Sequence, residues 1–192
     1  MKLFSPTRLE KVYQNYQFRL FNTKDFKNDM LIFGKLCHES LKQTPYYSEK
    51  TPEEMYELMK KVKFLFKAED IVFAMKDGKE VGFIYTHPNY AELFNKGKLN
   101  YITFFFKQLF KKPKEVIYNV IGVLPEHQMN GVAMNLIHYS LQLRSKDYKY
   151  GNSSFILEEN EESTRLCRGM CIDLNKRFHL YEIPRGNVEC IR

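Results

Sequence analysis

The fold is decided by the stretch Val123-Leu124-Pro125-Glu126-His127-Gln128-Met129-Asn130-Gly131-Val132-Ala133, which joins a predicted strand to a predicted helix. The strand is the apolar run at 116–123, and the helix runs from about 130 to 146. Small residues at 131 and 133 would let the backbone approach a ligand closely. The N-terminus of the helix would present unpaired N–H groups and the positive end of a dipole. This arrangement suits a pyrophosphate.

The spacing of this stretch differs from the two common nucleotide-binding loops. It matches neither G-x-x-x-x-G-K-[ST] nor G-x-G-x-x-G. We therefore do not expect ATP, GTP or NAD. Glu126 would repel a phosphate if it pointed inward, so we expect its side chain to face solvent.

The rest of the chain predicts a mixed α/β domain of order β-α-α-β-β-β-α-β-α-β. Thr51-Pro52-Glu53-Glu54 is a helix-start signal, and Asp77-Gly78 is a strong hairpin-turn signal. Besides the central strand and helix, we expect a strand at 16–21, a helix at 25–43, a helix from residue 52, a hairpin over 70–86, a strand at 154–157, a helix at 161–170 and a strand at 177–183.

Length and composition indicate one globular domain over 1–192, with an N-terminal part at 1–67 and a core at 68–183. Of the 192 residues, 44% are hydrophobic and 28% are charged. No apolar run approaches the ~18 residues of a membrane span. Pro6 and Arg8 come before a signal-peptide core could form. Four cysteines are too few for a secreted disulfide scaffold, so we expect a soluble, cytoplasmic protein.

The formal net charge of +7 is concentrated in two segments, 1–67 and 96–115. Scattered lysines favour a solvated face over a nucleic-acid site. The segment 99–112 holds five aromatic residues and ends in lysines. Three interpretations stay open for it: a helix that packs its aromatics on the sheet, a membrane-surface helix, or a lid over an apolar or extended acceptor.

The central stretch resembles the GNAT superfamily of acetyl-CoA-dependent N-acetyltransferases. The family's phosphate signature, Gln/Arg-x-x-Gly-x-Gly/Ala, is matched by Gln128, Gly131 and Ala133. Asn160 follows a predicted strand and precedes a short helix, where the family places an Asn that contacts pantetheine. The resemblance implies a GNAT-like mixed, mostly antiparallel sheet flanked by helices, with residues 68–183 as the acetyl-CoA-binding core.

The resemblance also implies which residues hold acetyl-CoA. The family splays its fourth strand from its fifth, which would free backbone groups of Ile121, Gly122 and Val123 for pantetheine. Backbone amides of the loop would hold the pyrophosphate, from the residues Gln128, Met129, Asn130, Gly131, Val132 and Ala133. The alternative is that Gly131 merely starts a helix and that Asn160 is an N-cap.

The sequence departs from the family at the position of its general acid. Many members carry a Tyr seven residues after the Asn, and here that residue is Cys167. A thiol could donate the proton, and Tyr118 on the central strand is the other candidate. A helical Cys is more often a small hydrophobe. Cys167 and Cys171 have no further metal-ligating partner nearby, so we expect no metal site.

The expected function is transfer of an acetyl group from acetyl-CoA to a primary amine, by direct attack in a ternary complex. Two alternatives stay open. One is a non-catalytic module that binds acyl-CoA or a protein partner, which is favoured because Cys167 replaces the family's Tyr. The other is a basic protein that binds nucleic acid or an anionic membrane, favoured by 96–115. We expect acetyl-CoA and an amine as partners rather than nucleic acid or membrane, and a homodimer stays open.

Overall fold

The computed structural model describes residues 6–45, 47–93, 112–170 and 176–178. Three predicted features lie wholly or largely outside these residues: the aromatic segment 99–112 up to residue 111, Cys171, and 179–183 of the closing strand. The chain forms two compact units, Met1–Ser154 and Phe155–Arg192, which are described separately. In the described part of the chain, no helix is both long and apolar enough to cross a membrane.

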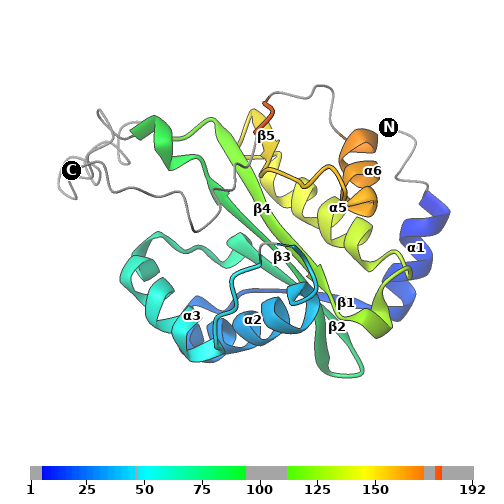
Figure 1. The fold of residues 1–192 in the computed structure, drawn as a ribbon, viewed down its shortest axis with the longest axis horizontal. Helices are drawn as coiled ribbons and strands as arrows, with labels where there is room; N and C mark the ends of the chain where they lie inside the picture. The colour runs from blue at the N-terminus through cyan, green and yellow to red at the C-terminus, as the bar shows by residue number, and fades with distance from the viewer. Residues whose placement is uncertain (1–5, 46, 94–111, 171–175, 179–192) are drawn as a thin grey trace, which may run out of the picture. The chain divides into compact units, whose positions relative to one another are not determined.

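The first unit is built on a five-stranded sheet of order β1-β2-β3-β4-β5 (Figure 1). Its first three pairings are antiparallel, and β4 pairs with β5 in parallel. The predicted mixed, mostly antiparallel sheet is therefore confirmed. The strands are β1 (Gln17–Leu20), β2 (Ile71–Lys76), β3 (Lys79–Pro88), β4 (Glu115–Val123) and β5 (Tyr150–Ser153).

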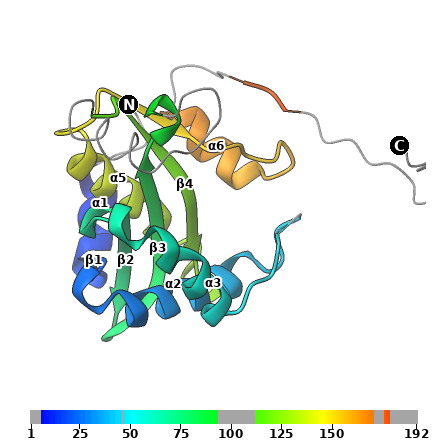
Figure 2. The same cartoon turned by 90° about the vertical axis from the view of Figure 1, so that its left-hand side faces the viewer.

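Helices cover both faces of this sheet (Figures 1 and 2). One face carries α2 (Phe26–Leu41) and α3 (Pro52–Met59), and the other carries α1 (Pro6–Asn15) and α5 (Val132–Arg144). The buried apolar residues between α2 and the sheet are Phe21, Phe26, Met30, Phe33, Leu36, Cys37, Ile71, Phe73 and Phe83. Burial of these side chains is the main force that holds α2 on the sheet.

The local start and turn signals are confirmed. Thr51 accepts a hydrogen bond from the Glu54 N–H at 3.1 Å, and the Glu54 carboxylate accepts from the Thr51 N–H at 2.8 Å. This reciprocal capping box satisfies two N–H groups at the start of α3. Asp77 and Gly78 both have positive φ, 49° and 77°, as a two-residue type I′ turn between β2 and β3 requires.

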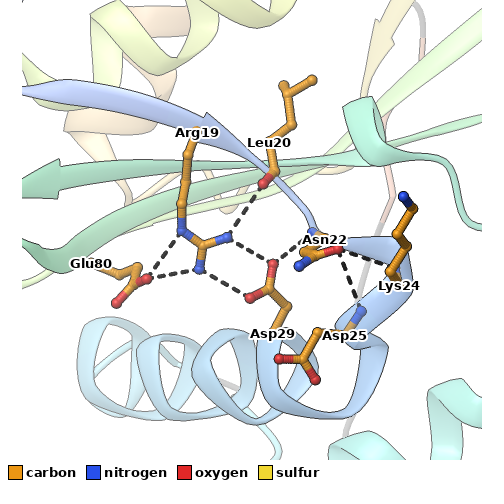
Figure 3. A network of polar contacts seen from close by, with 7 residues as sticks. All are labelled: Arg19, Leu20, Asn22, Lys24, Asp25, Asp29 and Glu80. Atoms are coloured by element: carbon orange, nitrogen blue, oxygen red, sulfur yellow. Dashed lines mark hydrogen bonds and ion pairs between the residues drawn. The ribbon is translucent and has the colours of Figure 1, made fainter.

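Two charged networks tie helices to the sheet. Figure 3 shows the first, in which Arg19 of β1 donates to Asp29 of α2 and to Glu80 of β3, both at 2.7 Å. In the second, Arg144 at the end of α5 forms an ion pair with Asp70 and donates to Thr86 Oγ1 at 2.9 Å. Arg144 and Asp70 are 1% and 3% exposed, so this second network lies in the interior.

The chain departs from prediction at two places in the first unit. Helix α1 was not expected, although Leu9, Val12 and Tyr16 are spaced for one helical face and all three are buried. The strand expected at 154–157 was wrong, because β5 ends at Ser153. Its pairing with β4 selects this position, since Glu115 to Tyr118 align with Tyr150 to Ser153.

In the second unit, the described residues include one helix, α6 (Glu161–Met170), as predicted. The residues 155–157, predicted to lie in a strand, have no regular structure, and the Phe155 side chain is 78% exposed. Arg177 and Phe178 also lie outside any strand, which contradicts the start of the predicted closing strand. Phe155 and Phe178 are both largely exposed, so these two aromatic residues are not buried in a sheet.

Candidate functional site

Strand β4 has a backbone edge that β5 leaves open. β4 pairs with β3 from Val116 to Val123, whereas its pairing with β5 ends at Tyr118. The last hydrogen bond from the β5 side is donated by the Ser154 N–H to the Tyr118 carbonyl at 2.9 Å. Within the described residues, the segment 119–123 therefore has a strand partner on one side only.

A β-bulge at Asn119 decides which groups face the open edge. Tyr85 pairs with Val120 and Thr86 pairs with Tyr118, so Asn119 is the extra residue. Beyond the bulge, the Leu124 N–H donates to the Val81 carbonyl of β3 at 2.9 Å.

Because peptide groups alternate sides along a strand, those of residues 120, 122 and 124 face β3. The groups of Ile121 and Val123 then face the open edge. The geometry thus favours Ile121 and Val123, and places the backbone groups of Gly122 in the β3–β4 ladder. Gly122 still matters for packing, since a Cβ there would lie 2.6 Å from a ring atom of Phe83.

A short 3₁₀ turn and a side-chain hydrogen bond stabilise the loop after β4. A 3₁₀ turn, η5 (Pro125–His127), follows the strand, and Gln128 then donates from Nε2 back to the Val123 carbonyl at 3.0 Å. Of the two residues on the open edge, Val123 therefore keeps its N–H for a ligand, whereas its carbonyl already accepts from Gln128. Gln128, the first residue of the phosphate signature, therefore stabilises the loop through its side-chain hydrogen bond.

The loop ends at the N-terminus of α5 in a conformation unusual for L-residues. Met129 and Gly131 both have positive φ, 62° and 79°, and Met129 is 87% exposed. The first backbone bond of α5 runs from the Asn135 N–H to the Gly131 carbonyl at 3.1 Å. The N–H groups of Val132, Ala133 and Met134 precede it and have no acceptor within the helix. They form the positive end of the α5 dipole.

Asn135 is a site residue that the sequence analysis missed. It is fully buried, and its Nδ2 donates to the same Gly131 carbonyl at 3.1 Å. A polar residue on the inner, apolar face of the predicted helix is the signal that could have identified it. Together with Gln128, it fixes both ends of the loop.

The side chains around the loop carry few charges. Glu126 is exposed, as expected. Met129 and Asn130 are also exposed, and neither adds a charge. An anion bound here would therefore be held by backbone N–H groups and by the helix dipole. Among the described residues, no cluster of three or more His, Cys, Asp or Glu side chains could hold a metal ion.

Tyr118 lies where β4 and β5 separate. Burial raises the pKa of its hydroxyl to about 12, while the positive charge of Arg144 and the hydroxyl of Ser140 act in the opposite direction. The side chain therefore stays protonated throughout the neutral range, and the raised pKa makes its hydroxyl a weaker acid than that of an exposed tyrosine. Cys167, the other predicted acid, is a partly buried cysteine on α6 of the second unit.

Asn160 caps α6. Its side-chain Oδ1 accepts from the Ser163 N–H at 3.0 Å, and its carbonyl accepts from the Thr164 N–H at 2.9 Å. The N-cap interpretation is therefore confirmed for the oxygen of this side chain. A pantetheine contact, which would use the amide NH₂ group, stays a prediction.

Comparison with known proteins reveals similarity in structure alone. No protein-family sequence model and no curated protein sequence matches the chain. An aminoglycoside N-acetyltransferase, AAC(6')-Iy, in complex with CoA gives a TM-score of 0.56 at 18% identity, over 88% of this chain and 94% of that chain. An aminoglycoside acetyltransferase from an uncultured soil metagenomic sample, in complex with sisomicin, gives 0.58 at 11% identity, over 91% and 99%.

A GNAT family acetyltransferase from Brucella melitensis, in complex with acetyl-CoA, gives a TM-score of 0.51 at 17% identity, over 77% of this chain and 80% of that chain. Identities of this size carry information about the fold. The chain has the fold of the GNAT acetyltransferases, as the phosphate-loop resemblance implied.

Proposed function

We propose that this protein is an N-acetyltransferase that transfers an acetyl group from acetyl-CoA to a primary amine. The observation that carries the proposal is the open edge of β4, which begins where pairing with β5 ends at Tyr118. The open edge is followed by a loop that ends at the N-terminus of α5, where backbone N–H groups are exposed to a ligand. An extended amide-bearing arm followed by a pyrophosphate would match these two features in order.

In the proposed complex, the pantetheine arm pairs with Ile121 and the Val123 N–H as an added strand. The pyrophosphate lies against the backbone amides from Met129 to Ala133, whereas the Gln128 N–H already donates to the Pro125 carbonyl at 3.2 Å. The loop has no Lys or Arg, so binding depends on amides that are already oriented rather than on mobile charges. Solved structures with this fold contain CoA or acetyl-CoA, which supports acetyl-CoA as the co-substrate.

The proposed reaction is a direct transfer. The neutral amine nitrogen attacks the thioester carbonyl carbon, a C–N bond forms, and the C–S bond breaks. The amine loses one proton to solvent, and the departing CoA sulfur receives one proton. We assign that proton donation to Tyr118, because its backbone lies at the start of the open edge and its hydroxyl is protonated at neutral pH.

Replacing Tyr118 by Phe is expected to lower kcat by about a hundredfold, since general acid catalysis contributes 10²–10⁴-fold. The KM for acetyl-CoA should change little, because the hydroxyl acts on the departing sulfur. The matched variant is Cys167→Ala, for which we expect kcat near that of the wild type. Steady-state kinetics of both variants checks the assignment, and the reverse ranking would transfer the acid role to Cys167.

The Asn160→Ala variant distinguishes two roles of this side chain, a contact with pantetheine and the cap of α6. If the amide binds the arm, the dissociation constants of acetyl-CoA and free CoA should rise together, about three- to tenfold. Loss of the cap alone would lower the free energy of unfolding by ~1 kcal/mol and leave both constants unchanged. Calorimetric titration well below the melting temperature distinguishes these results. Equal affinities in variant and wild type would contradict the pantetheine role.

A non-catalytic module that binds acyl-CoA is the second candidate, favoured by the Cys at position 167. Release of free CoA from acetyl-CoA, measured over a panel of primary amines, separates the two. The proposed enzyme releases CoA only when an accepted amine is present. A protein that binds acetyl-CoA but releases no CoA with any amine of the panel would support the module instead.

A further inference from the structure

Helix α1 and the residue that follows it contact both ends of the loop between His127 and Gly131, which we call the phosphate loop. Tyr16, directly after α1, contacts His127, which immediately precedes the loop residue Gln128. Val12 of α1 lies against Gly131, where a Cβ would come within 3.2 Å of Val12 Cγ2. A helix that precedes the first strand of the sheet therefore supports a loop more than 110 residues later in the sequence.

The contact between Tyr16 and His127 is well defined. The Tyr16 hydroxyl and His127 Nδ1 are 3.1 Å apart, and their rings meet edge to face at 5.8 Å between centroids. Tyr16 is 5% exposed, and the ammonium group of Lys76 lies 5.3 Å from its ring centroid. The hydroxyl is thus held in one place and can fix the imidazole of His127.

This support matters because the loop adopts a conformation that residues other than glycine seldom adopt. Met129, at φ 62°, is non-glycine, and such a backbone persists where surrounding contacts determine it. Gln128 and Asn135 supply two of those contacts from within the β4–α5 connection. Val12 of α1 and Tyr16, directly after α1, supply the others.

We propose that Tyr16 is a positioning residue for the phosphate end of the cofactor, acting through His127 to hold the loop amides in their binding arrangement. The inference rests on the proposed function and adds α1 to the elements that determine cofactor affinity. It predicts that removal of one buried hydroxyl, distant in sequence from the loop, weakens binding of the phosphate-bearing part of CoA.

The test is Tyr16→Phe, which keeps the buried ring and removes the hydroxyl. The dissociation constant of CoA should rise about three- to tenfold, as expected for one lost hydrogen bond. Binding of pantetheine, which lacks the pyrophosphate, should not change. In a His127→Ala background the same substitution should have no further effect, because the two residues act as one unit.

Tyr13→Phe is the matched control. It removes a hydroxyl on α1 that lies 3.4 Å from His138 Nδ1, and CoA affinity should stay as in the wild type. Wild-type protein that fails to bind CoA would refute the proposed function itself. Wild type and Tyr16→Phe with equal CoA affinity, or equal losses in both tyrosine variants, would overturn the role of Tyr16.

Discussion

Gly131→Glu is expected to abolish CoA binding, with a loss of about a hundredfold or more in affinity. Position 131 has φ 79°, so a side chain there strains the backbone, and its Cβ would also crowd Val12 of α1 at 3.2 Å. The new carboxylate also adds a negative charge beside the site of the pyrophosphate. Wild-type protein should be stabilised by about 2.7 kcal/mol at a CoA concentration of 100 Kd, and the variant should not be. Thermal denaturation with and without CoA measures this difference.

Two substitutions of the exposed Met129 test the effect of charge on CoA binding without a difference in backbone strain. Met129→Glu and Met129→Lys share the same backbone conformation and differ in charge, and the 87% exposure of this side chain leaves folding unaffected. The Glu variant should weaken CoA binding and the Lys variant should strengthen it, each by about three- to tenfold. If both variants bind CoA as the wild type does, the phosphates do not lie at this loop.

Asp70→Asn should destabilise the fold by about 3–5 kcal/mol, because it leaves the Arg144 guanidinium buried without its counter-charge. Desolvation of the two buried charges offsets most of their attraction, so the intact pair contributes little net stability, whereas the loss of one partner leaves a buried charge uncompensated. Urea denaturation measures the change in the free energy of unfolding, and a loss below about 1 kcal/mol would contradict the account.

Two controls accompany this variant. Asp70→Asn combined with Arg144→Met removes both charges and should recover most of the lost stability. Glu39→Gln breaks the exposed pair with Lys35, whose charged atoms are 3.9 Å apart, and should leave the unfolding free energy within error.

The sequence predicted the elements whose signals are local. Asp77-Gly78 defines its hairpin because both residues tolerate positive φ, and Thr51 with Glu54 defines the start of α3 by reciprocal capping. The loop from Gln128 to Gly131 was found in the same way, from small residues between a strand and a helix. Helix α1 carried a readable signal as well, in the spacing of its buried residues.

Features set by long-range pairing could not be predicted. β5 consists of Tyr150-Gly151-Asn152-Ser153, a polar run that becomes a strand because β4 offers it partners. The bulge at Asn119 likewise depends on register with β3. Arg144 and Asp70 are 74 positions apart, and nothing local in either segment indicates their pairing.

Amide hydrogen exchange with and without saturating CoA tests the central claim most directly, because it reports on the open edge of β4 and on the loop together. Binding of the cofactor by the Val123 N–H and by the amides from Met129 to Ala133 should slow exchange in peptides that cover 119–134. Peptides from β2, at 71–76, lie two strands away and should not change. Unchanged exchange over 119–134, at a CoA concentration that saturates binding, would contradict the account.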